Sequence, residues 1–148
     1  MIVRPATEAD IPAIIGMSAA FYAGTSYAAI SDMDDTAVIT IAGMAIETGT
    51  MLVAEVDGAL VGMVCLLVLP FLFNAKKTSA EEVAWWVDPD ARSSGAGAAL
   101  LAAIEPACLA AGADMIRMAT LATSPSHAGI LYERAGYVHS DTTYTKVL

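Results

Sequence analysis

The sequence predicts a single α/β domain in which strands and helices alternate along the chain. The chain has 148 residues, of which 57% are hydrophobic, and this is enough for one buried core. Strand-like runs and helical patterns follow one another from the first residues to the last. No internal repeat, low-complexity tract or linker interrupts them. Residues 1–148 are therefore expected to form one unit with one active or binding site.

The first part of the chain predicts one strand and two helices. The segment MIVRPAT forms a short first strand. Thr7 then opens a helix, with Asp10 three residues later in an arrangement that resembles a capping box. A polar and aromatic connection, residues 22–35, separates this helix from a second one at about Thr36 to Glu47. That connection is either solvated or lines a pocket.

The middle of the chain predicts a hairpin and a further strand. In TMLVAEVDGALVGMVCLLVL two strand-like runs meet at Asp57-Gly58, a dipeptide that strongly favours a hairpin turn. The apolar run of residues 59–73 is broken by Pro70 and is shorter than the roughly 20 residues that a membrane helix needs. It is therefore interpreted as a buried strand with a following loop. That loop passes through residues 74–77 and leads to a strand, AEEVAWWVDP.

The last part predicts two helices, each connected to a strand. One helix runs from about Gly95 to Ala111 and is closed by Gly112. The strand MIRMAT and a helix in SPSHAGILYERAG follow, with Ser124 as N-cap and Pro125 at the first helical position. The segment YVHSDTTYTKV supplies a final pair of strands. The complete order is β-α-α-β-β-β-α-β-α-β-β.

The charge balance and the cysteines argue against several classes of function. The chain has 16 acidic and 7 basic side chains, and Lys76-Lys77 is the only adjacent basic pair, so a nucleic acid would be repelled. Cys65 and Cys108 lie in apolar surroundings without metal-ligand spacing, which indicates reduced, packed thiols. No secretory signal is visible. We expect a cytoplasmic protein that binds no nucleic acid, membrane or metal.

The segment WWVDPDARSSGAGAAL places a strand, a turn of small residues and a helix start next to each other. Glycine and serine before a helix leave its first N–H groups free, and these groups with the helix dipole favour an anion such as a pyrophosphate. Arg92 adds a positive charge beside them. Alternatively, Gly95 and Gly97 only let the helix and the sheet approach closely.

Two common anion-binding motifs do not fit this segment. A P-loop needs a lysine followed by serine or threonine at the helix start, where this chain has Ala98 and Ala99. A dinucleotide-binding turn needs a third glycine, where this chain has Leu100, and an acid at the end of the next strand, where MIRMAT has none. Triphosphate hydrolysis and dinucleotide binding are therefore disfavoured.

A third pattern fits. The segment VDPDARSSGAGAALL resembles the central motif of the GNAT superfamily of N-acetyltransferases, with Val87, Pro89, Arg92, Gly95 and Gly97 at the motif positions. Three other segments are similar to further family motifs in the same order: VRPATEADIPAI, LVAEVDGALVGMV and GILYERAGYV. The resemblance covers nearly the whole chain. It implies one GNAT-like domain with a mixed, mostly antiparallel sheet of about six to seven strands, flanked by about four helices.

The resemblance implies an acetyl-CoA-dependent N-acetyltransferase that acts on a primary amine of a small molecule or on an amino terminus. In the family the glycine turn holds the pyrophosphate of acetyl-CoA, and the matching residues here are Arg92, Ser93, Ser94, Gly95, Ala96, Gly97 and Ala98. The strand before the turn pairs with the cofactor's pantetheine arm through backbone at Trp85, Trp86 and Val87. The two tryptophan side chains are expected in the core.

One position departs from the family pattern. Many members carry an asparagine that contacts the cofactor where this chain has Pro125. Ser124, Ser126 or His127 would have to replace that contact, and we assign Ser126 to the cofactor site on this ground.

The resemblance also implies catalytic residues. Tyr132 matches the tyrosine that often protonates the departing sulfur; from the residues alone it would be a buried helix tyrosine bonded to the backbone. Glu81 matches a glutamate that some members use as a base, directly or through water. Because side chains alternate along a strand, only one of Glu81 and Glu82 can face the acetyl group. An exposed pair of glutamates is equally typical of a solvated strand end.

Substrate selection in the family depends on the segment between the first two helices and on the loop before the cofactor strand, here residues 22–35 and 71–78. These segments contain residues suited to an amine that arrives as a cation: Tyr22, Tyr27, Asp32, Asp34, Phe71 and Phe73. A surface loop of the same composition is as compatible with the sequence. Dimers are common in the family, so a homodimer is expected. The main alternative function is a non-catalytic regulatory module that binds acyl-CoA.

Overall fold

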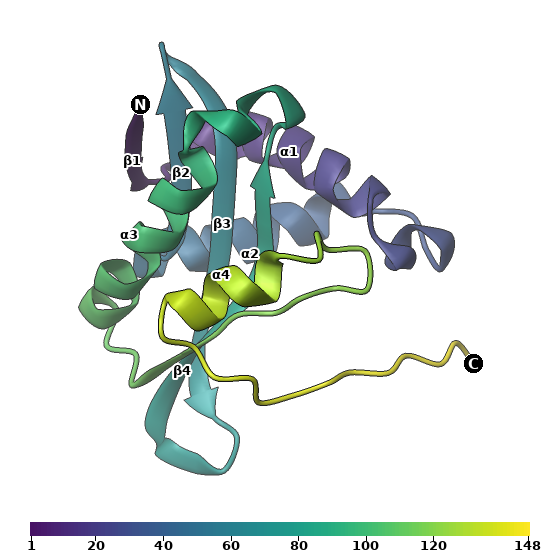
Figure 1. The fold of residues 1–148 in the computed structure, drawn as a ribbon, viewed down its shortest axis with the longest axis vertical. Coiled ribbons are helices and arrows are strands. Elements are labelled where there is room, and N and C mark those ends of the chain that lie inside the picture. The colour runs from purple at the N-terminus through teal and green to yellow at the C-terminus, as the bar shows by residue number, and fades with distance from the viewer.

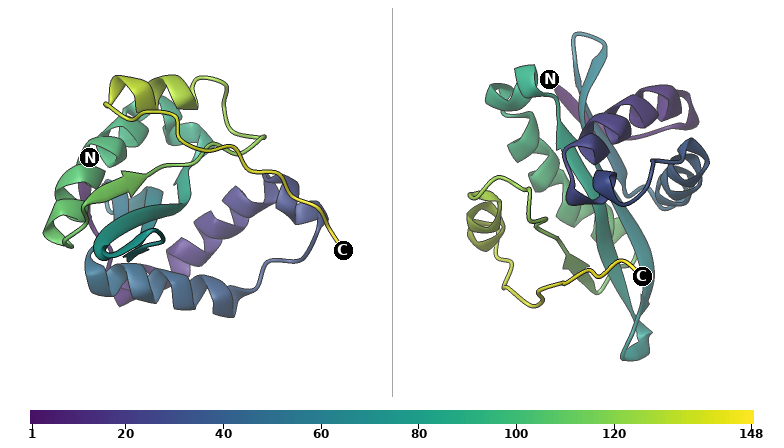
Figure 2. Two further views of the ribbon diagram at one scale, coloured as in Figure 1. Left: turned by 90° about the horizontal axis from the view of Figure 1, so that it is seen from below. Right: turned by 90° about the vertical axis from the view of Figure 1, so that its right-hand side faces the viewer.

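The computed structural model describes residues 1–148 and contains one five-stranded sheet with helices on both faces (Figures 1 and 2). In order across the sheet, the strands are β1 (Ile2–Pro5), β2 (Met51–Val56), β3 (Ala59–Phe71), β4 (Asn74–Val87) and β5 (Met115–Arg117). All neighbouring pairs are antiparallel except β4 and β5, which are parallel. The structure thus confirms a mixed, mostly antiparallel α/β fold.

Four α-helices and three short 3-10 helices connect the strands. The α-helices are α1 (Ile11–Ala23), α2 (Asp35–Thr48), α3 (Ala96–Ala110) and α4 (Ala128–Arg134). The 3-10 helices are η1 (Glu8–Asp10), η2 (Ser26–Ala29) and η3 (Pro89–Ser94). None of these helices has the length and apolar content that crossing a bilayer requires.

Each face of the sheet has its own apolar core. Helices α1 and α2 cover one face, and α3 and α4 lie over the other (Figure 1). Ile14 of α1 packs in the first core with Met63 of β3, whereas Leu100 of α3 packs in the second core with Val64. Since neighbouring side chains of a strand point to opposite faces, the central strands β2 and β3 contribute to both cores and are apolar almost throughout.

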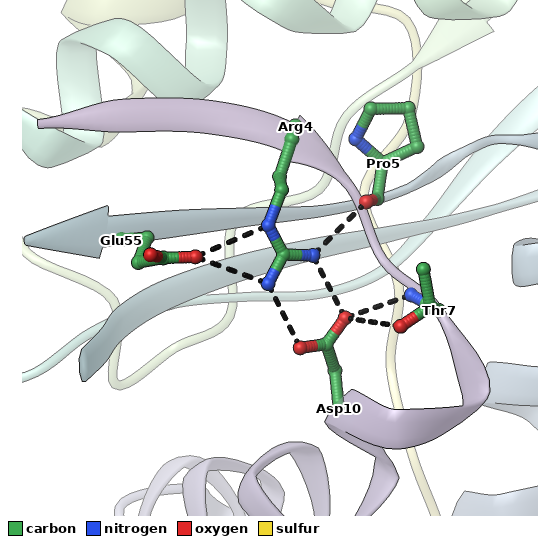
Figure 3. Close-up of polar contacts among 5 residues, drawn as sticks. All are labelled: Arg4, Pro5, Thr7, Asp10 and Glu55. Atoms are coloured by element: carbon green, nitrogen blue, oxygen red, sulfur yellow. Dashed lines mark hydrogen bonds and ion pairs between the residues drawn. The ribbon is translucent and has the colours of Figure 1, made fainter. Parts of the chain in front are cut away.

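The entry into the first helix is fixed by a cluster of polar contacts (Figure 3). The predicted capping box is present: the amide and the hydroxyl of Thr7 donate to Asp10 Oδ2 at 2.8 and 3.1 Å. The Arg4 guanidinium donates to both carboxylate oxygens of Asp10, at 2.8 and 2.9 Å, and its Nε donates to Glu55 at 3.2 Å. The cluster therefore ties η1 to strands β1 and β2.

The predicted turn at Asp57-Gly58 is confirmed. Asp57 and Gly58 have φ angles of 51° and 82°, and both positive values are what a tight two-residue hairpin turn requires. Val56 and Ala59 pair directly on either side of it.

Two expected boundaries were wrong. Residues 74–77 belong to β4 and not to a loop, because β3 and β4 pair along almost their whole length, out to Phe71 and Asn74. The resulting long hairpin protrudes from the molecule (Figure 1). Helix α4 begins at Ala128 and not at Pro125, since the Ala128 amide bonds to the Pro125 carbonyl in a preceding turn. The Ser124 hydroxyl accepts from the Leu121 amide at 2.9 Å and does not cap the helix.

The expected last pair of strands is absent, so the sheet has five strands where six to seven were predicted. Residues 138–148 form no regular element and run away from the sheet (Figure 1). A physical reason is the shortness of β5, which offers only Met115–Arg117 as an edge for further pairing. A hairpin of two short strands is at best marginally stable without such an edge.

Candidate active site

Strand β4 contains a bulge between the two glutamates and the two tryptophans. The β3 partner of Ala84 is Cys65 and that of Glu82 is Leu66, which leaves Val83 without a partner. The extra residue resets the alternation of side chains, so that Val83 and Ala84 both line the face covered by α1 and α2. Glu82 instead lies opposite Leu66, on the face of α3 and α4.

Beside the bulge, the sheet loses a strand pairing. Strands β4 and β5 pair only through Ser79–Glu81 and Met115–Arg117. Beyond this point β4 continues to Val87 without a partner on the β5 side, while the chain after β5 leads toward α4. The β4 backbone from Glu82 to Val87 therefore has an unpaired edge, which includes the predicted residues Trp86 and Val87.

Glu82 and Tyr132 meet at Ala119, just after β5. Glu82 Oε2 accepts a hydrogen bond from the Ala119 amide at 2.7 Å, and the Tyr132 hydroxyl donates to the Ala119 carbonyl at 3.1 Å. Burial raises the pKa of Glu82 to about 7, although the Ala119 amide and the Tyr132 hydroxyl act in the opposite direction. Burial, and then the charge of Glu82, raise the pKa of Tyr132, so its hydroxyl keeps its proton at neutral pH.

Glu81, which the family resemblance implied as the base, bonds to other residues. Its carboxylate accepts a hydrogen bond from the Ser79 hydroxyl at 2.6 Å and forms an ion pair with Arg117 at 3.1 Å. Arg117 also binds Asp141 in the C-terminal segment. Of the two glutamates, Glu82 is the one that lies beside Tyr132, and the bulge at Val83 could not be predicted from the alternation of residue types.

Aromatic side chains connect Tyr132 to the glycine turn. The rings of Trp85 and Tyr137 lie 5.8 and 5.9 Å from that of Tyr132. Trp85 packs in the core of the α3 face, with its Nε1 buried and without a hydrogen-bond partner. Trp86 points to the other face, where its Nε1 donates to Asp88 at 2.8 Å and the Arg92 guanidinium lies 5.1 Å from its ring.

The turn before α3 leaves several N–H groups free. Gly95 has a φ angle of 86°, a left-handed conformation that favours glycine. The Gly95 amide donates no hydrogen bond, the amides of Gly97 and Ala98 lie in the first turn of α3, where the helix itself offers no acceptor, and that of Ala96 has only a long contact of 3.3 Å with the Ser94 hydroxyl. Free amides at the N-terminus of a 15-residue helix suit an anion such as a pyrophosphate. Ser93 is exposed at the same turn.

Two further residues predicted to bind the cofactor are Arg92 and Ser126, whose side chains do not belong to the turn of free amides. Arg92 is exposed, and its Nε donates to the Val87 carbonyl at 3.2 Å. Ser126 is exposed in the turn before α4, and its hydroxyl makes no hydrogen bond.

A pocket of about 290 Å³ lies between α1, α2 and the bulged part of β4. Tyr22 and Tyr27, both predicted as substrate residues, line it. Asp32 does not line it and is exposed. Phe71 and Phe73 lie at the tip of the β3–β4 hairpin, where their rings pack edge to face at 5.7 Å, and they do not contribute to the pocket either. The sequence did not predict that residues of α2 line this pocket, because their spacing along the helix is the same as that of ordinary core residues.

The chain matches one known protein family. Residues 20–137 match the sequence model of a family described as the acetyltransferase (GNAT) family. No curated protein sequence matches the chain significantly.

Three solved structures illustrate the similarity of the fold. A ribosomal-protein-alanine N-acetyltransferase from Brucella melitensis biovar Abortus 2308 is 17% identical, with a TM-score of 0.74 and 100% of both chains covered. A transcriptional regulator from Bacillus halodurans C-125 is 18% identical, with a TM-score of 0.75 and 99% of both chains covered. A putative acetyltransferase from Agrobacterium tumefaciens str. C58 is 19% identical, with a TM-score of 0.71 and 100% of both chains covered. At these identities the likeness concerns the fold alone.

Proposed function

Since the chain belongs to the GNAT acetyltransferase family, we propose that it is an N-acetyltransferase that transfers an acetyl group from acetyl-CoA to a primary amine. The observation that carries this proposal is the meeting of the Glu82 carboxylate and the Tyr132 hydroxyl at Ala119, beside the unpaired edge of β4. A proton acceptor and a proton donor at one place are what acyl transfer from a thioester to an amine needs.

The residues present fit acetyl-CoA. The free amides of Gly95, Gly97 and Ala98 would hold its pyrophosphate, together with Ser93, Ser94 and Ala96 of the same turn. The unpaired backbone of Trp85, Trp86 and Val87 would take the hydrogen bonds of the pantetheine arm. When bound, acetyl-CoA supplies a thioester carbon as the acceptor of the amine nitrogen and a thiolate as the leaving group.

The proposed reaction forms one N–C bond, breaks one C–S bond and moves one proton. A Glu82 carboxylate with a pKa of about 7 is partly ionised at neutral pH and accepts a proton from the amine nitrogen. The Tyr132 hydroxyl, which is protonated at this pH, donates a proton to the thiolate. Glu82 then returns its proton to Tyr132 beside it, which leaves both residues as they began. The products are an N-substituted acetamide and free CoA.

Two measurements on the purified protein test the proposal. Isothermal titration calorimetry should detect binding of acetyl-CoA, with NAD and ATP as controls that do not bind. Release of free CoA should then depend on added primary amine. Binding of acetyl-CoA without amine-dependent release would replace the enzyme by a regulatory acyl-CoA-binding module, and no binding would overturn the assignment of the glycine turn.

A further inference from the structure

We infer that the acceptor is a small primary amine with an apolar body, one aromatic ring or an alkyl chain of similar size, which is held in the pocket between α1, α2 and β4. This inference rests on the proposed function and specifies its substrate class. It differs from the expectation of an acid-lined pocket, which composition alone favoured for the segment of residues 22–35.

The lining of the pocket is apolar on every side. Fifteen of its 17 lining residues are hydrophobic, Ser18 and Thr25 are the other two, and no charged side chain is among them. The Thr25 hydroxyl is already occupied, since it donates to the Tyr22 carbonyl at 2.8 Å. A cationic or polyhydroxylated body would lose its hydration here without gaining partners, which makes its burial unfavourable.

Two polar side chains of the connecting segment, Tyr22 and Asp34, bond to the backbone. The Tyr22 hydroxyl lies 2.8 Å from the Ser31 carbonyl and 3.0 Å from the Tyr27 carbonyl, so Tyr22 presents its ring to the pocket and its hydroxyl to the segment. Asp34 accepts a hydrogen bond from the Thr36 amide at 2.9 Å and caps α2. Asp32 is exposed outside the pocket. Asp35, also exposed, does not line the pocket either, so no acid of this segment faces a cation inside it.

At its sheet end the pocket lies next to the segments that hold the proposed reacting groups, with Glu82 itself on the other face of β4 and not among the walls. Val83, next to Glu82 in the sequence, is one of its walls, and Leu121, two residues after Ala119, is another. Cys65 also lines the pocket, and the Glu82 charge lies near enough to contribute to the raised pKa of its thiol. An amine bound here would extend its nitrogen past the unpaired edge of β4 toward Glu82 and keep its apolar body against α1 and α2.

The volume of the pocket limits the size of the apolar part of the amine. A pocket of about 290 Å³ is roughly twice the apolar cavity of about 150 Å³ that holds a benzene molecule in another protein. One ring with a short linker therefore fits.

The test compares amines of matched reactivity and different bodies. We expect kcat/KM to rise about three- to fourfold with each methylene from ethylamine to pentylamine, until the pocket is full. Phenethylamine should exceed ethanolamine and putrescine by more than tenfold. It should also bind to the protein without acetyl-CoA, with a Kd at or below about 1 mM by calorimetry. If putrescine, ethanolamine or a peptide with an N-terminal alanine is acetylated as efficiently as phenethylamine, the inference is wrong while the proposed function stands.

Two variants link this selectivity to the pocket. Ala37 lies on the exposed side of α2 and lines the pocket, so Ala37→Phe should fill it without disturbing a core and lower kcat/KM for phenethylamine at least tenfold. Ala20→Phe, on the exposed surface of α1 outside the pocket, is the matched control and should change it less than twofold. The Kd of acetyl-CoA should stay unchanged in both. An equal effect of the two variants would overturn the inference.

Ser18→Asp gives an independent result, because Ser18 makes no hydrogen bond and its replacement adds an acid to the wall. The preference should shift from phenethylamine toward putrescine by tenfold or more, whereas Ser18→Ala should keep the original order. If no amine is acetylated and acetyl-CoA does not bind, the proposed function fails, and binding of phenethylamine alone then decides whether the pocket is an apolar amine site.

Discussion

At the scale of single residues, Glu82 has the environment that the sequence predicts least well. In the sequence it is one of two adjacent acids at a strand, and the family resemblance favours its neighbour Glu81 as the base. In the structure Glu81 forms an ion pair with Arg117. Glu82 lies in a less polar environment, and burial raises its pKa to about 7. A carboxylate with a pKa near the working pH is suited to accept a proton and to release it again.

The first prediction concerns the activity of Glu82. Because the carboxylate must be ionised to accept a proton, kcat/KM should rise with pH through a limb near pH 7. In Glu82→Gln this limb should disappear and kcat should fall by about 10² or more, with an unchanged Kd for acetyl-CoA. A pH series of CoA release checks this. Glu81→Gln is the matched control, and a larger loss in the control would return the base role to Glu81.

The second prediction concerns the stability effect of the same residue. A carboxyl whose pKa is raised from 4.5 to about 7 by folding takes up protons in the folded state, so the free energy of unfolding falls as the pH rises across that interval. Glu82→Gln should therefore raise the free energy of unfolding above pH 7 by on the order of 1–3 kcal/mol. Below about pH 4.5 the difference should vanish. Urea denaturation at pH 4 and pH 8 measures both values.

The third prediction concerns Tyr132. Tyr132→Phe removes the proton donor and leaves the Ala119 carbonyl without its hydrogen bond, while the ring contacts with Trp85 and Tyr137 stay. The turnover rate should fall by about 10² and the free energy of unfolding by about 1 kcal/mol. Stopped assays of CoA release measure the first effect, and urea denaturation measures the second. An unchanged rate would remove Tyr132 from the mechanism.

At the scale of elements, much of the fold could be predicted because local signals agree with tertiary packing. The Asp57-Gly58 turn, the Thr7–Asp10 capping box and the glycine that ends each of α2, α3 and α4 act within a few residues, so the sequence contains them. The bulge at Val83 depends on the register between β3 and β4, and the end of pairing after Glu81 depends on β5, which is separated from β4 by α3. These two features build the candidate site, and no local pattern encodes them.

The fourth prediction concerns the junction of η3 and α3. Gly95 has a φ angle of 86° and open space around its α-carbon, so Gly95→Ala would be strained by the backbone alone. It should lower the free energy of unfolding by about 1–2 kcal/mol and weaken acetyl-CoA binding, because the free amides would shift. Gly43→Ala within α2, also with open space, is the control and should stabilise by up to about 1 kcal/mol. Denaturation and calorimetry report both quantities, and an unchanged Kd in Gly95→Ala would argue against the anion site.

At the scale of the whole molecule, the sheet ends in an open edge and the C-terminal segment pairs with no strand. Strand β5 has a partner on one side only. Residues 142–148 make no hydrogen bond, and Tyr144, Val147 and Leu148 are largely exposed. The last polar contact of the C-terminal segment with the body of the protein is the ion pair between Asp141 and Arg117, which is exposed to solvent and therefore adds little stability.

The fifth prediction follows from this arrangement. Deletion of residues 142–148 should leave the melting temperature within about 1 °C and the Kd of acetyl-CoA unchanged, because the deleted residues bury no apolar area in the monomer. Calorimetric melting and sedimentation of the full and the shortened chain check it. A marked loss of stability, or a change from dimer to monomer, would mean that the segment pairs in solution with a sheet edge, its own or that of a second copy. The exposed backbone of β5 could pair with the C-terminal segment of its own chain or with that of a second copy. Only pairing with a second copy depends on protein concentration, so melting temperatures at two concentrations would distinguish the two cases.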